Sequence, residues 1–140
     1  GDLVGGVLQV HAAVNARMLE LVLDMAEPDD QRVTELYAGY GNFTLALAAR
    51  ASALLAVEGD GPAASACREN LRLRDFRHAR VSQADVGKFA LREPSDVLVL
   101  DPPRGGCPQL AQFAAQARAA RVVYISCHMT TLQRDLRALA

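Results

Sequence analysis

The sequence predicts a doubly wound α/β domain with a parallel β-sheet. Short, apolar, β-branched segments alternate with amphipathic segments at the spacing of βα units. No Asn-Gly hairpin signal separates the expected strands. The most apolar strand, residues 96–100, is hydrophobic without alternation, which is typical of a strand buried on both faces of a sheet.

The elements of the first half follow from spacing and from stop signals. Residues 7–26 carry apolar side chains at helical intervals, and Pro28-Asp29-Asp30 closes this expected helix. A strand is expected at 32–37, stopped by the glycines of Ala38-Gly39-Tyr40-Gly41. Asn42 is expected to cap a helix through residue 50, which leads to a second strand at 53–57.

The second half continues the alternation. A helix is expected at 62–73, starting at a proline. Strands are expected at 78–82 and 96–100, the latter stopped by Asp101-Pro102-Pro103. A helix at 108–119, a fifth strand at 121–125 and a helix from about residue 130 complete the pattern.

Length and composition set the class of protein. The 140 residues are 51% hydrophobic and 22% charged, which suits one globular domain and excludes a disordered chain. No apolar run approaches the ~18 residues of a membrane span, and the N-terminus lacks a basic leader segment. A cytoplasmic protein without membrane association is expected. Three cysteines suit neither a disulfide framework nor a zinc site, so reduced thiols and no metal are expected.

Charge is unevenly distributed along the chain. Residues 1–60 carry three arginines and nine acidic residues, a net charge of −6. Residues 61–140 carry twelve basic and seven acidic residues, a net charge of +5. Such asymmetry is typical both of a face for an anionic partner and of ordinary solvated helices, so it does not decide between them.

Functional side chains are expected at the carboxyl ends of the strands, where ligands bind in open parallel sheets. Gly39 and Gly41 allow a close backbone approach to a ligand, although Thr44 breaks the dinucleotide fingerprint. Glu58 suits a ribose hydroxyl pair, and Asp85 suits an adenine amino group. An adenosine-containing ligand is therefore expected, while the missing P-loop argues against ATP hydrolysis.

Four ordered motifs resemble one family. They are Glu35-Leu36-Tyr37-Ala38-Gly39-Tyr40-Gly41-Asn42-Phe43-Thr44, Val57-Glu58-Gly59, Asp101-Pro102-Pro103-Arg104, and Val123-Tyr124-Ile125-Ser126-Cys127 followed by Thr131-Leu132-Gln133-Arg134-Asp135. The chain resembles the RNA 5-methyluridine methyltransferases of tRNA and 23S rRNA from about Gln9 to its end. The resemblance implies an S-adenosylmethionine-dependent methyltransferase sheet, with an RNA substrate.

The resemblance also implies residue roles. Gln9, Tyr37, Asn42, Glu58, Asp85 and Asp101 are expected to contact the methyl donor. Cys127 is expected to be the nucleophile that adds to carbon 6 of uracil and activates carbon 5. Without the resemblance, a buried structural thiol is the better explanation of this cysteine.

Several departures from the family pattern stand out. His128-Met129 replaces the usual Asn-Pro after the cysteine, His11 replaces an asparagine, and Ala38 replaces a cysteine. The general-base glutamate, the last two of the usual seven strands and the RNA-binding barrel are missing. The chain is therefore interpreted as a catalytic-domain fragment, residues 1–140, with little turnover expected. Its open sheet edge favours an edge-mediated dimer.

Two other functions are open. One is another S-adenosylmethionine-dependent methyltransferase, in which Cys127 is structural. The other is a non-catalytic module that binds RNA or the cofactor. In that case the basic stretch of Arg72, Arg74, Arg77 and Arg80 is expected to contact phosphates, and binding is expected to weaken steeply with salt.

Overall fold

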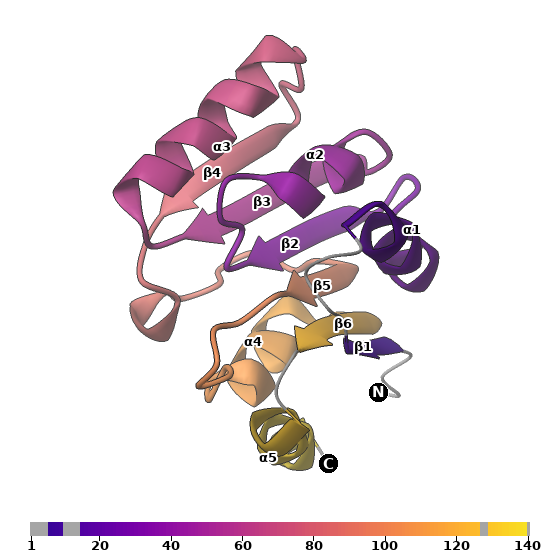
Figure 1. The fold of residues 1–140 in the computed structure, drawn as a ribbon, viewed down its shortest axis with the longest axis vertical. Coiled ribbons are helices and arrows are strands. Elements are labelled where there is room, and N and C mark those ends of the chain that lie inside the picture. The colour runs from indigo at the N-terminus through magenta and orange to yellow at the C-terminus, as the bar shows by residue number, and fades with distance from the viewer. Residues whose placement is uncertain (1–5, 10–14, 127–128, 140) are drawn as a thin grey trace.

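The computed structural model describes residues 6–9, 15–126 and 129–139, and they form a parallel sheet between helices (Figure 1). The strands are β1 (Gly6–Gln9), β2 (Arg32–Leu36), β3 (Ala53–Glu58), β4 (Ala79–Gln83), β5 (Val97–Leu100) and β6 (Arg121–Ser126). The helices are α1 (Asn15–Ala26), α2 (Asn42–Ala48), α3 (Gly61–Leu73), α4 (Leu110–Ala117) and α5 (Met129–Leu139), with a 3₁₀ turn η1 (Val86–Lys88).

The six described strands are arranged in the order β1-β6-β5-β2-β3-β4, and every pair is parallel. The predicted fold class is confirmed, and the five predicted strands correspond to β2–β6, with no boundary differing by more than one residue. β1 is an additional strand that the sequence analysis did not predict. Among the described residues, no helix is long and apolar enough to cross a bilayer.

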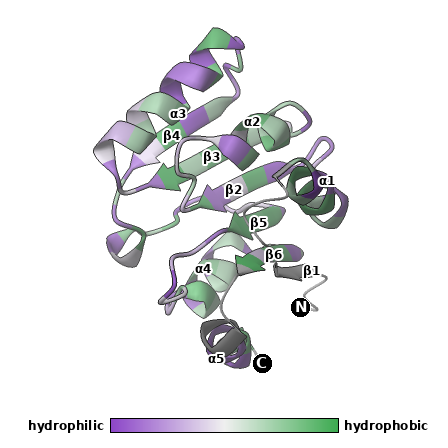
Figure 2. Ribbon diagram, in the orientation of Figure 1, coloured by the Kyte–Doolittle hydropathy of each residue, from purple (hydrophilic) through white to green (hydrophobic). Residues whose placement is uncertain are grey.

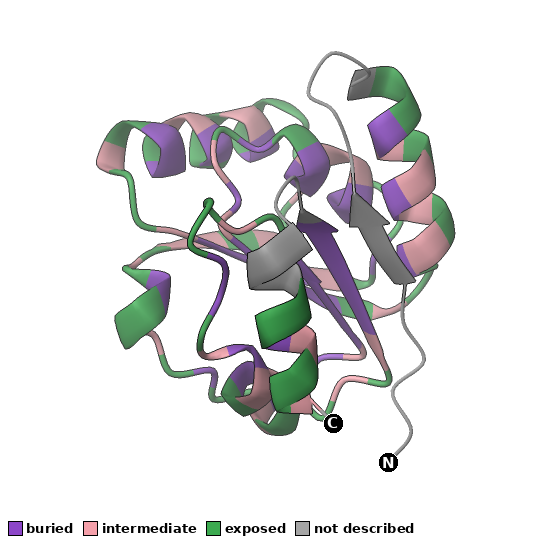
Figure 3. Cartoon of the chain, turned by 60° about the horizontal axis from the view of Figure 1, so that its bottom comes forward, coloured by how far each residue is buried: buried purple, intermediate pink, exposed green. Residues whose placement is uncertain are grey.

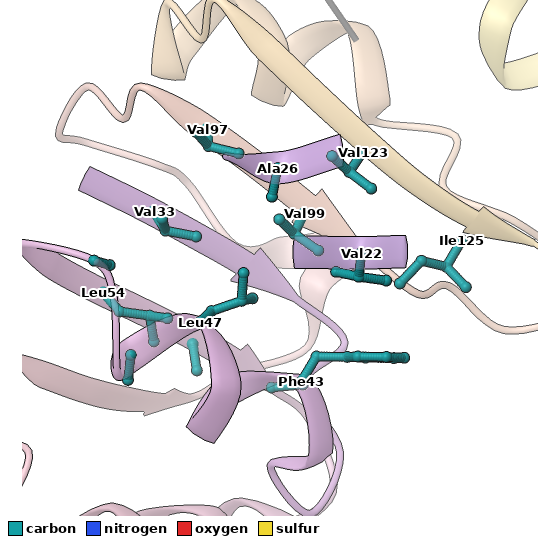
Figure 4. Close-up of a cluster of buried hydrophobic side chains, with 14 of the residues drawn as sticks. Val22, Ala26, Val33, Phe43, Leu47, Leu54, Val97, Val99, Val123 and Ile125 are labelled. Atoms are coloured by element: carbon teal, nitrogen blue, oxygen red, sulfur yellow. The ribbon is translucent and has the colours of Figure 1, made fainter. Parts of the chain in front are cut away.

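Two apolar cores cover the two faces of the sheet. The first core packs α1 and α2 against one face through Val22, Phe43 and Leu47 among others (Figure 4). The helix α3 contributes Cys67 to the same core. The second packs α4 and part of α5 against the other face, around Phe113. Apolar residues run along the strands, and exposed residues lie on the outer faces of the helices (Figures 2 and 3).

The expected helix at 7–26 is wrong at its N-terminal end. Residues 6–9 form β1, which pairs with β6 from Gly6 opposite Val123 to Gln9 opposite Ser126. The helix begins only at Asn15. Val7 and Leu8 fit a strand as well as a helix, and long-range pairing overrides the local helical spacing. β1 also covers the edge of β6 that the sequence analysis expected to be open.

Two helix starts show how local chemistry sets boundaries. Asp60 caps α3, because its Oδ2 accepts a hydrogen bond from the Ala63 backbone N at 3.0 Å. The predicted cap at Asn42 is wrong. Gly41 is the N-cap of α2 and makes no side-chain cap bond, and Asn42 is the first helical residue. Gly41 has a left-handed backbone conformation (φ 102°) at the start of the helix. This conformation favours glycine over asparagine.

Candidate functional site

The carboxyl ends of the central strands converge on one edge of the sheet (Figure 1). In register, Leu36 at the end of β2 lies opposite both Val57 in β3 and Leu100 at the end of β5. From β2 the chain crosses to β3 on one side, whereas β5 lies on the other side, so the strand order reverses between β2 and β5. Open parallel sheets bind ligands at such a reversal. The loops that begin at Tyr37 and Asp101 flank it.

The loop after β2 turns tightly toward α2. Tyr37 and Gly39 both have a φ of 61°, and the Gly41 backbone N donates to the Ala38 carbonyl at 3.2 Å. A Cβ on Gly39 would meet no atom within 4 Å, so this glycine leaves open space beside the backbone. A Cβ on Gly41 would lie 3.1 Å from the Cys67 Sγ. The first glycine therefore suits ligand approach, and the second is required by helix packing.

Glu58 joins this loop to the end of β3. Its Oε1 accepts from the Gly39 backbone N, and its Oε2 accepts from the Asp60 backbone N, both at 2.7 Å. An ionised carboxylate has about four acceptor positions, so each oxygen retains capacity for a further donor. The structure places the predicted ribose-binding carboxylate directly against the predicted glycine loop.

The two predicted aspartates follow strands that do not pair with each other, because β2 and β3 lie between β5 and β4 in the sheet. Asp85 follows β4, and its Oδ1 accepts from the Gly87 backbone N at 2.9 Å, which fixes the start of η1. Asp101 follows β5 and remains accessible to solvent, although partial burial raises the pKa of its carboxyl above the usual range. Neither carboxylate has an ion pair among residues 6–9, 15–126 and 129–139.

A buried carboxyl lies beneath the site, and the sequence analysis did not assign it a role. Glu35 in β2 is only 2% exposed, and Thr44 in the first turn of α2 donates a hydrogen bond to its Oε1. The pKa of Glu35 is raised to about 8, mainly because the carboxyl is buried. The hydrogen bond from Thr44 lowers this pKa, whereas the nearby charges of Asp101 and Glu58 raise it further. An acidic residue on the inward face of an apolar strand is the signal that could have identified it.

The loop after β5 is held by α5 through a second buried carboxylate. Asp135 is 2% exposed, and its Oδ2 accepts from the Tyr124 hydroxyl at 2.6 Å and from the Cys107 backbone N at 2.7 Å. Arg134 donates to Asp135 Oδ1 at 3.0 and 3.1 Å and to the Gly105 carbonyl at 2.6 Å. This network fixes the loop that begins at Asp101 against the helix that follows β6.

Tyr37 extends this network to the first loop. Its side chain is hydrogen-bonded to the Cys107 side chain, and burial, followed by this bond, raises its pKa. Burial also raises the pKa of the Cys107 thiol. Cys67 and Cys107 are both buried free thiols, in agreement with the absence of an assigned role. The structure thus ties Tyr37, predicted to contact a ligand, to the loop after β5.

The remaining predicted residues are placed only in part. Gln9 ends β1 and pairs in register with Ser126, the last residue of β6, so its backbone lies at the same edge as the other strand ends. Asn42 opens α2 and is exposed. Cys127 and His128 lie outside the described residues. Within the described ranges, no three His, Cys, Asp or Glu side chains form a group that could hold a metal ion.

The comparisons with known proteins agree with one another. A family model described as tRNA (uracil-5-)-methyltransferase matches residues 4–140. The 23S rRNA (uracil(1939)-C(5))-methyltransferase RlmD of Pseudomonas putida is 40% identical over 141 residues, which cover 96% of this chain and 31% of that protein. The protein of the same description from Stenotrophomonas maltophilia is 38% identical over 134 residues, which cover 91% and 30%. The chain thus spans about a third of these relatives' length.

A solved structure shows the same fold. The tRNA (uracil-54, C5)-methyltransferase of Pyrococcus abyssi, in complex with S-adenosyl-L-homocysteine, superposes with a TM-score of 0.79 at 23% identity. The alignment covers 94% of this chain and 33% of that one. The matched family model spans all of the described strands and helices. The chain belongs to the tRNA (uracil-5-)-methyltransferase family.

Proposed function

We propose that the chain binds S-adenosylmethionine at the carboxyl edge of its sheet and forms the catalytic part of an enzyme that methylates carbon 5 of uridine in tRNA or rRNA. The observation that carries the proposal is the convergence of the open Gly39 backbone and the Glu58 carboxylate at the reversal of strand order. Family membership supplies the reaction class.

The residues at this edge fit the proposed cofactor. Glu58 offers acceptor capacity for the two ribose hydroxyls, and Asp85 offers it for an adenine amino group. The carboxylates of Glu58, Asp85 and Asp101 also make the edge favourable for a ligand that carries an ammonium and a sulfonium group. When bound, S-adenosylmethionine supplies an electrophilic methyl group at its sulfonium.

The chemical role in this proposal falls to Cys127, one residue beyond the end of β6. Its thiolate adds to carbon 6 of uracil, forming a carbon–sulfur bond and making carbon 5 nucleophilic. Carbon 5 would then take the methyl group as the sulfonium–methyl bond breaks, with S-adenosylhomocysteine as the leaving group. Loss of the carbon-5 proton to a base and departure of the thiolate restore the ring. The family membership and the position at a strand end support this assignment.

Calorimetric titration with S-adenosylhomocysteine tests the proposed cofactor binding. The parent chain is expected to bind it, and Glu58→Gln is expected to raise the Kd about tenfold or more, because a hydrogen bond to a charged group contributes about 1.5–3 kcal/mol. Glu93→Gln is the matched control, since Glu93 is an exposed carboxylate paired with Arg80 away from this edge. Folded protein that binds no S-adenosylhomocysteine would contradict the proposal.

An RNA in which 5-fluorouridine replaces uridine tests the proposed role of Cys127 as the nucleophile. Fluorine at carbon 5 cannot leave as a proton, so the thiol mechanism traps a covalent protein–RNA adduct when S-adenosylmethionine is present. The parent is expected to form the adduct, visible as a shifted band under denaturing conditions, and Cys127→Ser is expected to form none. Methyl transfer without an adduct would show instead that Cys127 is structural.

A further inference from the structure

An open hollow of about 440 Å³ lies between α1, α2 and α3, beside the proposed cofactor edge. Its lining includes Leu19, Tyr40, Asn42, Leu45, Asn70 and Arg74. The volume lies within the range of about 300–1,000 Å³ that is usual for small-ligand sites. The loop after β2 contributes to both places, because Gly39 bonds to Glu58 at the edge and the next residue, Tyr40, lines the hollow.

The aromatic ring of Tyr40 is not packed in the core of the described structure. It is 64% exposed, whereas large apolar side chains elsewhere in the described structure are mostly buried. Its backbone is nevertheless fixed, because the Asn70 Nδ2 in α3 donates to the Tyr40 carbonyl at 3.3 Å. An exposed aromatic ring on an anchored backbone is suited to stack against a flat partner.

Arg74 differs from the other arginines of the basic stretch. Arg72 pairs with Glu69 at 2.6 Å, Arg77 with Asp75 at 2.8 Å, and Arg80 with Glu93 at 3.0 Å. Within the described part of the chain, the Arg74 side chain has no ion pair and no hydrogen bond.

The charge of the hollow is therefore positive. Its lining contains no acidic residue to offset the charge of Arg74. Arg72, Arg77 and Arg80 line a separate hollow together with Asp75. The hollow beside Tyr40 thus combines one exposed aromatic ring with one uncompensated cation.

We infer that this hollow binds a nucleotide of single-stranded RNA, with a base stacked on Tyr40 and a phosphate against Arg74. An aromatic ring beside a positive charge is the usual surface for unpaired nucleotides, since bases stack on the ring whatever their sequence. The inference rests on the proposed function for the class of partner. RNA that reaches the cofactor edge across the loop after β2 passes this hollow, so the contact positions the strand near the methyl donor.

Fluorescence anisotropy with a labelled oligouridylate of about 12 nucleotides tests the inference. Tyr40→Ala and Arg74→Ala are each expected to raise the Kd at least about fivefold, and Tyr40→Phe is expected to retain binding because the ring is kept. Arg74→Ala is also expected to reduce the slope of log Kd against log salt by about 0.7, the value for one phosphate contact on a single strand. Tyr40→Ala is expected to leave that slope unchanged.

Arg72→Ala is the matched control, because Arg72 is an exposed arginine in the last turn of α3, two residues before Arg74 at the C-cap, and is already paired with Glu69. It is expected to change the Kd less than twofold. Parent-like RNA binding by both Tyr40→Ala and Arg74→Ala would overturn the inference, as would a parent chain that binds no oligouridylate.

Titration of the same variants with S-adenosylhomocysteine separates this inference from the proposed function. Unchanged cofactor binding together with weakened RNA binding supports the hollow as an RNA contact. If the parent fails to bind S-adenosylhomocysteine but loses RNA on Tyr40→Ala, the hollow is supported and the cofactor proposal fails. Equal loss of RNA in Arg72→Ala and Arg74→Ala would indicate a diffuse charge effect and would overturn the specific contact.

Discussion

Gly39 and Gly41, two residues apart in the loop after β2, have different physical roles. Gly41 has a φ of 102°, and an added Cβ would lie 3.1 Å from the Cys67 Sγ. Gly39 has a φ of 61° and open space around it. Gly105 also has open space, and its φ is outside the left-handed region. An alanine would therefore meet both a close contact and backbone strain at Gly41, backbone strain alone at Gly39, and neither at Gly105.

Gly41→Ala is expected to lower the free energy of unfolding by about 2–3 kcal/mol, because it combines backbone strain with a close contact. Gly39→Ala is expected to cost about 1 kcal/mol from strain alone. Gly105→Ala, the control, is expected to change stability by less than about 0.5 kcal/mol. Urea unfolding measures all three, and an equal loss at Gly39 and Gly41 would contradict the steric role of Cys67.

Sequence reasoning located residues at strand ends better than residues inside the fold. Glu58, Asp85 and Asp101 could be found because a strand followed by a polar residue is a local pattern. Glu35 could not be assigned a role in the same way, since its importance depends on Thr44 in another element and on burial that only packing creates. The sequence analysis treated Arg74 like the neighbouring arginines. The acidic partners of those arginines, Glu69, Asp75 and Glu93, become visible only in the structure.

At the scale of elements, local patterns gave β2–β6 closely but failed where pairing decides the structure. The apolar spacing of residues 7–26 fits one helix, yet residues 6–9 pair with β6. The position of α5 was not predicted either. Besides the apolar contacts of Leu136 and Leu139, it depends on the buried Asp135 carboxylate, which accepts hydrogen bonds from β6 and from the loop after β5. Long-range hydrogen bonds of this kind leave no periodic signal.

Removal of the Asp135 carboxylate is expected to destabilise the domain. Asp135→Ala leaves the Tyr124 hydroxyl and the Cys107 backbone N without their buried acceptor, so a loss of about 3 kcal/mol is expected. Glu93→Ala removes an exposed carboxylate paired with Arg80 and is expected to cost less than about 0.5 kcal/mol. Denaturant unfolding measures both.

A double-mutant cycle checks the mechanism of this loss. Tyr124→Phe alone is expected to cost about 1–2 kcal/mol, and its effect is expected to shrink once Asp135 is replaced by alanine. Fully additive losses would show that the two side chains act independently, in contradiction to the 2.6 Å hydrogen bond between them.

At the scale of the whole molecule, the sheet concentrates acidic groups at one edge and buries one of them. Glu35, Glu58 and Asp101 belong to β2, β3 and the end of β5, the three strands around the reversal of strand order. Their proximity raises the pKa of Glu35 beyond the effect of its burial. The concentration of carboxyl groups at this edge therefore carries a free-energy cost for the folded protein, and this cost depends on pH.

Stability is expected to fall as pH rises between about 4.5 and 8. The pKa of Glu35 is about 8 in the folded chain and near its ordinary value of 4.5 in the unfolded chain. Between these values the folded state binds more protons than the unfolded state, so the free energy of unfolding decreases with pH, by at most about 1.4 kcal/mol per unit. Below 4.5 both states hold the proton, and above 8 both have lost it, so this contribution is then constant.

Glu35→Gln tests this dependence because the amide keeps an acceptor for Thr44 and cannot ionise. The difference in free energy of unfolding between parent and variant is expected to shift steadily in favour of the variant from pH 5 to pH 8, by about 2 kcal/mol or more. Glu93→Gln, at an exposed carboxylate, is expected to show no such trend. Denaturant unfolding at several pH values gives these differences. A constant difference for Glu35→Gln would mean that Glu35 is already ionised in the folded protein across this pH range, in contradiction to a pKa raised by burial.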